Sequence, residues 1–230
     1  TLSDAAKGNL WIDMSHALIC QGRFRDALVA VDNGVALALG NSLLLINRGE
    51  VYSHLGREAE ALACYEEAHA AQPDALLPQI DIAAALVTLG LLDEAKAQLD
   101  AVLAVDGEHG CAWYVTGMRE TALDHFDDAL DAFDKSIILE PGHASHYAAF
   151  AELLLKLEDP VHAGQVIERA LAIDAFDART WRIKAQALRA AGKLEEADEA
   201  ERHGAALLAE QTAQVDAYLQ AKGQHGGLEG

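Results

Sequence analysis

The chain has 230 residues, 51% of them hydrophobic, and 37 acidic against 17 basic side chains give it a net charge of -20. This balance disfavours nucleic acid as a partner, because phosphate contacts depend on Lys and Arg. No stretch approaches the ~18 consecutive apolar residues of a membrane span, and the first seven residues lack the apolar core of a signal peptide.

The three cysteines, Cys20, Cys64 and Cys111, share no short-spacing motif. Isolated thiols in odd number favour a reducing compartment over a disulfide framework, so the cytoplasm is the expected location. The sequence begins with Thr1, which leaves open that it is a fragment or a processed form.

A period of 34 residues organises most of the chain. It is marked by Ala27, Ala61, Ala95, Ala129, Ala163 and Ala197. Counted from Gly8, it gives six units without insertion or deletion: residues 8–41, 42–75, 76–109, 110–143, 144–177 and 178–211. Such a period indicates one supersecondary unit that is copied and stacked, so we expect residues 1–211 to form one elongated domain.

Each unit predicts two helices. Positions 8 and 20 of the unit hold small residues, while positions 4 and 24 are mostly large, as expected where two helices interlock. Position 15 is glycine in four units and predicts a left-handed cap at the end of the first helix. Pro73 and Pro141, at position 32, end the second helix in two units.

The second unit carries the clearest motif: Leu45, Gly49, Tyr52, Gly56, Ala61, Tyr65, Ala68 and Pro73. These columns resemble the tetratricopeptide repeat, and the resemblance covers all six units. It implies an all-α fold, a right-handed α-α superhelix (solenoid) of six helix-turn-helix repeats. The resemblance also implies that the first helices line the concave face and the second helices form the convex outside.

Residues 212–230 need a separate interpretation. Leu207, Leu208, Val215, Tyr218 and Leu219 continue a helical spacing, which predicts that the last helix extends to about Lys222 as a capping helix. Gly223, Gly226, Gly227 and Gly230 then predict a flexible tail. The alternative is that this helix folds into the groove of a neighbouring molecule and forms a homo-oligomer.

The resemblance places the binding groove on positions 2, 5, 9 and 12 of each unit, which form one helical stripe. Its middle is apolar and its far end is cationic. The predicted peptide-binding residues are Ile46, Leu77, Ile80, Val87, Tyr114, Met118, Arg179, Arg182 and Arg189. We expect the apolar ones to be partly exposed, unless superhelical curvature or the tail buries them. The arginines favour an acidic segment, unless they pair with Glu152 or with acids of the last unit.

We predict no catalytic residue, no cofactor and no metal site. Phosphate-binding loops, nucleophile motifs and paired catalytic carboxylates are not found in the sequence. His143 and His146 are three residues apart, but no thiol or carboxylate stands beside them at a convincing ligand spacing.

The leading hypothesis is a non-enzymatic adaptor or scaffold that binds a partly apolar peptide, acidic at one end, of a partner protein. One alternative is a substrate-recognition or regulatory domain of a larger enzyme, such as a glycosyltransferase. Another is a self-assembling structural scaffold.

Overall fold

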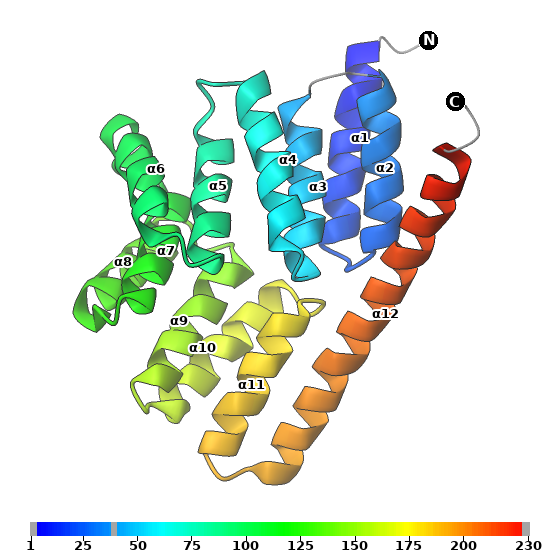
Figure 1. The fold of residues 1–230 in the computed structure, drawn as a ribbon. Coiled ribbons are helices and arrows are strands. Elements are labelled where there is room, and N and C mark those ends of the chain that lie inside the picture. Colours follow the sequence, from blue (N-terminus) through cyan, green and yellow to red (C-terminus); the bar gives the residue numbers. More distant parts are fainter. Residues whose placement is uncertain (1–3, 38–40, 227–230) are drawn as a thin grey trace.

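The computed structural model describes residues 4–37 and 41–226, and within them all regular structure is helical. This confirms the predicted all-α fold. The twelve helices of the described residues form six pairs that stack into a right-handed superhelix (Figure 1). Their bounds are α1 Asp4–Ile19, α2 Phe24–Leu37, α3 Ser42–His54, α4 Glu58–Ala71, α5 Leu76–Thr88, α6 Leu92–Val105, α7 Gly110–Ala122, α8 Phe126–Leu139, α9 Ala144–Lys156, α10 Pro160–Ile173, α11 Ala178–Ala190 and α12 Leu194–Gly226.

The small-residue columns lie where the two helices of each pair touch. All six alanines of the 34-residue period have no exposed surface. At Gly117 of α7, a Cβ atom would lie 2.8 Å from the ring of Phe133 on α8. Glycine and alanine at these positions therefore allow the large side chain of the partner helix to pack directly against the backbone.

The turn inside each pair shows why glycine recurs at position 15. Gly22, Gly56, Gly90 and Gly192 all have positive φ angles, and so do Asp124 and Glu158, with φ of 60°. In the second repeat the amide of Arg57 donates to the carbonyl of Tyr52 across this turn. The left-handed residue thus closes the end of the first helix in all six repeats, and two repeats accept the conformational cost of a side chain there.

The last helix does more than cap the stack. It continues beyond the predicted end at Lys222 to Gly226, while Gly227 and Gly230 of the predicted tail lie outside the described residues. In Figure 1, α12 begins beside α11 and runs back along α2, so that the last repeat reaches the first. We call this contact the closure. It was not anticipated from the sequence.

Buried and polar groups both hold the closure. Val215 has no exposed surface and packs in a cluster with Phe24 and Leu28 of α2. The hydroxyl of Tyr218 donates to the Asp32 carboxylate at 2.5 Å, and Arg57 lies 3.6 Å from Asp216. These contacts occur within one chain, so α12 covers its own first repeat.

Among the described residues, none of the helices combines the length and apolar character that crossing a bilayer requires.

Candidate functional site

Two cavities open on the inner side of the superhelix. The first, of about 660 Å³, is lined mainly by the end of α3, the start of α11 and the first half of α12, and we call it the arginine cavity because Arg179 and Arg182 lie in its wall. The second, of about 450 Å³, lies among α1, α3, α5, α7 and α9, and we call it the apolar cavity. Both volumes fall in the range of sites that bind small ligands or short segments.

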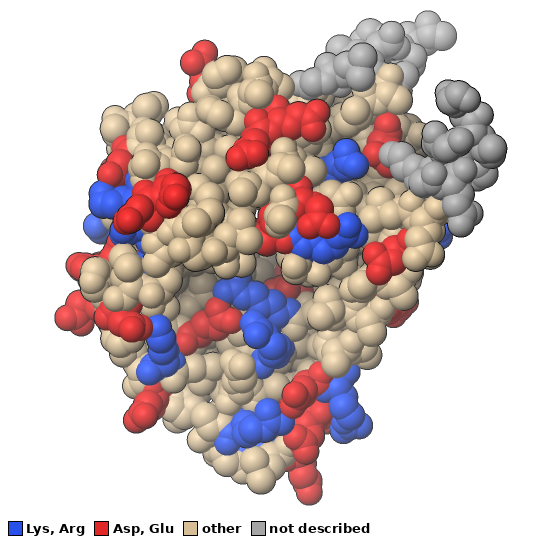
Figure 2. All heavy atoms as spheres, viewed as in Figure 1, with Lys and Arg blue, Asp and Glu red and all other residues tan. Residues whose placement is uncertain are grey.

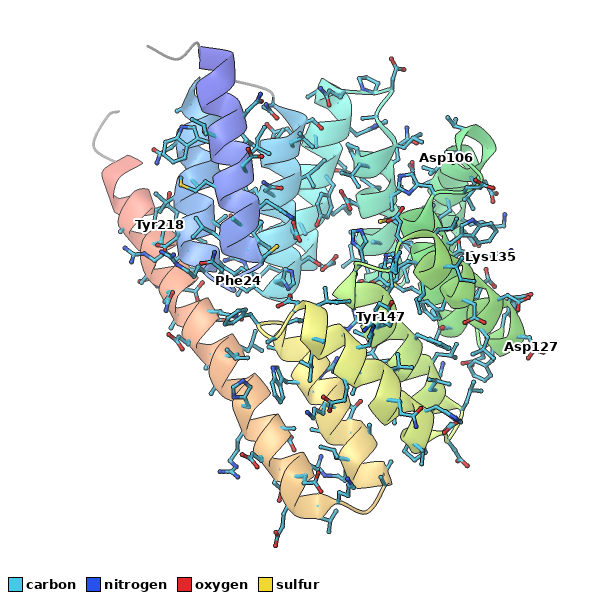
Figure 3. All side chains as sticks on the ribbon, turned by 180° about the vertical axis from the view of Figure 1, so that it is seen from behind. Phe24, Asp106, Asp127, Lys135, Tyr147 and Tyr218 are labelled. Atoms are coloured by element: carbon cyan, nitrogen blue, oxygen red, sulfur yellow. The ribbon has the colours of Figure 1, made fainter. Side chains whose placement is uncertain are left out.

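The arginine cavity is built across the closure. Gly204, Ala205 and Leu208 of α12 form one wall, and the turn after α3 forms the opposite one. Figure 3 shows the closure from behind, with Phe24 and Tyr218 along the line where α12 meets the first repeat. The cavity therefore exists because the last repeat folds back onto the first.

Two guanidinium groups share one carboxylate in this cavity. Arg179 donates to Glu152 Oε2 at 2.5 Å, and Arg182 donates to Glu152 Oε1 at 3.4 Å. The Arg182 side chain remains 60% exposed. Figure 2 shows Lys and Arg side chains gathered beside acidic ones in a hollow of this face. The exposed Arg182 guanidinium thus keeps N–H donors beyond those that contact Glu152.

The other lining groups of the arginine cavity are apolar or already engaged. Met118 and Leu208 supply apolar surface. Glu58 accepts a hydrogen bond from the Ser53 hydroxyl at 3.1 Å, and its pKa is raised by burial. Glu201 accepts one from Arg189 at 2.6 Å. Glu58 is thus hydrogen-bonded to Ser53, and Glu201 is paired with Arg189.

The apolar cavity contains a half-buried acid. Its wall includes Ile46, Leu77, Ile80 and Tyr114. Asp81 also faces it, and one of its carboxylate oxygens is buried without a hydrogen-bond partner among the described residues. Burial, followed by repulsion from Glu50, raises the pKa of Asp81 to about 8. This carboxyl group is therefore largely protonated at neutral pH.

The structure distributes the predicted peptide-binding residues over different places. Four of them line the apolar cavity, and three others, Met118, Arg179 and Arg182, line the arginine cavity. The expectation of partial exposure is wrong for Ile46, Ile80 and Val87, which are buried because the superhelix curves tightly enough for neighbouring first helices to cover them.

The three arginines do not converge on one point. Arg179 and Arg182 meet at Glu152, whereas Arg189 donates to Asp198 and Glu201 of α12. The sequence analysis had left both of these pairings open as alternatives to a contact with a partner. As far as the described residues define the two cavities, neither includes Val87 or Arg189.

A third arrangement escaped the sequence interpretation. Cys111 and Glu140 lie beside His143 and His146, and one ligand atom from each of the four lies within 4.8 Å of the others. We call this the Cys-His cluster. The thiol and the carboxylate that seemed to be missing come from the start of α7 and the end of α8. A second group consists of the half-buried Glu120 and the exposed His125 and Asp128.

The fold and the cavities define a class: a closed stack of helix-turn-helix repeats with two cavities on its inner side. Two family models, both described as tetratricopeptide repeat, match residues 42–75 and 80–144. The chain is a tetratricopeptide repeat protein, and such repeats indicate a protein-protein interaction scaffold.

Solved structures support the same fold. A tetratricopeptide repeat protein from Parabacteroides merdae is 17% identical and superposes with a TM-score of 0.62, covering 92% of this chain and 84% of that one. The protein TTC0263 from Thermus thermophilus is 18% identical, with a TM-score of 0.62, covering 78% of this chain and 98% of that one. At these identities the likeness concerns the fold alone.

One curated relative is similar in sequence. Protein O-mannosyl-transferase TMTC1 of Homo sapiens is 33% identical over 95 residues, which are 40% of this chain and 10% of that protein. The matched part thus spans about a tenth of the relative's length.

Proposed function

We propose that the protein is a scaffold that binds a carboxylate-bearing segment of a partner protein in the arginine cavity. The pairing of Arg179 and Arg182 with the single Glu152 carboxylate carries this proposal. Two guanidinium groups on one carboxylate leave donors directed into the cavity, in a chain whose net charge is -20. A planar guanidinium is well suited to a second carboxylate, which it can bind with two hydrogen bonds.

The lining of the cavity suggests what accompanies that carboxylate. Met118 and Leu208 provide apolar surface within the same 660 Å³, so a large apolar side chain next to the acid would lose contact with water there. The apolar cavity, through Leu77 and Tyr114, is the proposed site for further apolar residues of the partner. The proposal leaves out Val87 and Arg189, since neither lines a cavity as far as the described residues define the two.

The test measures binding of short fluorescent peptides that carry an apolar residue next to an acidic one. We expect Arg182→Glu to lower the affinity for the tightest-binding peptide by about 10- to 100-fold, since it replaces a charge-assisted hydrogen bond by repulsion. Arg169→Glu, a charge reversal at an exposed position that lines neither cavity, is the matched control and should change the affinity little. Equal losses in both variants would assign the effect to general charge, and an unchanged affinity in Arg182→Glu would remove the cavity from the proposal.

A second candidate function rests on the likeness to the human mannosyl-transferase. It is that these repeats are the recognition part of a larger enzyme, as the match over 95 residues suggests. An antibody against the repeats, applied to extracts of the source cells, would test it. A band well above 24.5 kDa supports a longer polypeptide, and a band at 24.5 kDa contradicts it.

A further inference from the structure

We propose that the Cys-His cluster is a zinc site, in which Cys111, Glu140, His143 and His146 each give one ligand. The cluster lies where the fourth and fifth repeats join. Cys111 is at the start of α7, Glu140 is the residue after α8, and His143 and His146 stand at the beginning of α9. Thiolate, imidazole and carboxylate are the ligand types that Zn²⁺ uses in proteins.

The distances within the cluster suit a small tetrahedral ion. Cys111 Sγ lies 2.9 Å from Glu140 Oε2, and His143 Nε2 lies 3.4 Å from the same oxygen. Ligand atoms around tetrahedral zinc are about 3.5 Å apart, as follows from bond lengths of roughly 2.0–2.3 Å. With all four ligand atoms within 4.8 Å, side-chain shifts of the order of 1 Å would complete the site.

One ligand has a free nitrogen that points to the same conclusion. His146 is 1% exposed, and its Nδ1 atom has no hydrogen-bond partner among the described residues. A buried polar atom of this kind normally has a partner. This unpartnered nitrogen, beside a thiol, a carboxylate and a second imidazole, is available to an ion.

Contacts around the cluster hold the ligands in place. The backbone amide of Gly110 donates to Glu140 Oε1 at 2.9 Å, and His109 Nδ1 lies 3.5 Å from that oxygen. The ring of His146 stacks on Tyr114 with 4.7 Å between centroids. Partners of this kind orient ligand side chains in metal sites. Cys111, His143 and His146 also line the apolar cavity, which provides a path for the ion.

The ligand set favours zinc over the common hard cations. Mg²⁺ and Ca²⁺ select oxygen ligands, of which the cluster provides one residue in four. Because the ligands come from α7, α9 and the end of α8, a bound ion would join two successive repeats as a structural staple. This inference does not depend on the proposed binding of a partner in the arginine cavity.

The test uses the full chain, stripped of metal and kept reduced, and titrates it first with Co²⁺ and then with Zn²⁺. We expect one equivalent of Co²⁺ to give a sulfur-to-metal charge-transfer band and tetrahedral visible bands, which Zn²⁺ then abolishes. Cys111→Ser should remove the charge-transfer band. His143→Ala should lower the affinity for zinc by more than about 100-fold. The His143 side chain is 53% exposed, so its loss leaves the core intact.

Two matched controls separate this site from incidental binding. Cys20→Ser removes an exposed thiol that lies 3.7 Å from His16 Nε2, and His125→Ala removes the imidazole of the second group, leaving Glu120 and Asp128. Both should bind zinc as the unaltered chain does. The proposal is overturned if no ion binds at micromolar concentration, if Co²⁺ gives no charge-transfer band, or if a control variant abolishes binding while His143→Ala does not.

Discussion

The contacts inside the repeats and the contact at the closure hold the same molecule by different means. Inside each repeat, one column of alanines packs at the same depth six times, between helices adjacent in sequence. At the closure, Tyr218 and Asp32 meet across 186 residues, and His54 and Asp177, 3.9 Å apart, join the second repeat to the end of the fifth. Repetition therefore explains the stack, while the closure depends on particular side chains of α12.

This difference matters for function because the arginine cavity belongs to both regions. Its arginines stand on α11, within the repeat pattern. Another of its walls is formed by α12, the helix that makes the closure. In an open solenoid, stability is carried by contacts between neighbours, and the two ends are independent. Here the ends are coupled, so a change on α12 is expected to alter the site without altering the repeats.

The largest expected effect is a change of the unfolding free energy with pH, caused by Asp81. The pKa of Asp81 is about 8 in the folded chain against 3.8 for a free aspartate, so between these pH values the folded chain holds the proton and the unfolded chain releases it. The stabilisation of the folded chain by the protonated Asp81 is complete below pH 3.8 and is lost as the pH rises to 8. Between pH 5 and 8 it amounts to about 4 kcal/mol.

Replacing Asp81 by Asn should remove that dependence. Urea unfolding at pH 5 and pH 8 should show a smaller loss of stability in Asp81→Asn than in the unaltered chain. The difference isolates this one group because all other titrating residues are shared. A parallel pH dependence in the two chains would show that Asp81 ionises freely.

The next largest effect tests the alanine and glycine columns. A side chain at position 117 would collide with the ring of Phe133, so Gly117→Val should cost about 3 kcal/mol of unfolding free energy. Gly164 is the matched control, because a Cβ there meets no atom within 4 Å. Gly164→Ala should instead stabilise the chain by about 0.5–1 kcal/mol through helix propensity. Equal behaviour of both variants would contradict the packing account.

The smallest effect concerns the closure. Val215→Ala removes two buried methyl groups and should cost about 2 kcal/mol. Hydrogen exchange should rise in α2 and in the second half of α12, and stay unchanged in α7 and α8. Uniform change over the chain would mean that the two regions unfold as one. A mass of twice 24.5 kDa for the unaltered chain in light scattering would show instead that α12 packs on a second molecule.

The sequence reveals what is repeated. The 34-residue register predicts the burial of Ala129 and places Asp124 and Glu158 in the glycine column, where the structure gives them the same left-handed angle. The curvature of the stack is not visible in the register, and for that reason the exposure predicted for Ile80 is wrong.

Contacts between unlike positions are harder to foresee. Val215 and Tyr218 lie beyond the last repeat, and their helical spacing predicts a helix without indicating its partner. Cys111 and Glu140 occupy positions 2 and 31 of one unit, and the histidines occupy position 34 and position 3 of the next. These positions meet where two repeats join, so the repeat register combined with the known packing could have brought them together.

The closure is the central claim, and small-angle X-ray scattering of the unaltered chain and of Val215→Asp tests it most directly. A buried, unpaired carboxylate at position 215 should detach α12 from α2 while the repeats remain stacked. We predict a larger radius of gyration and maximum dimension for the variant at unchanged helical content. Identical scattering from the two chains, with both fully helical, would contradict the closure.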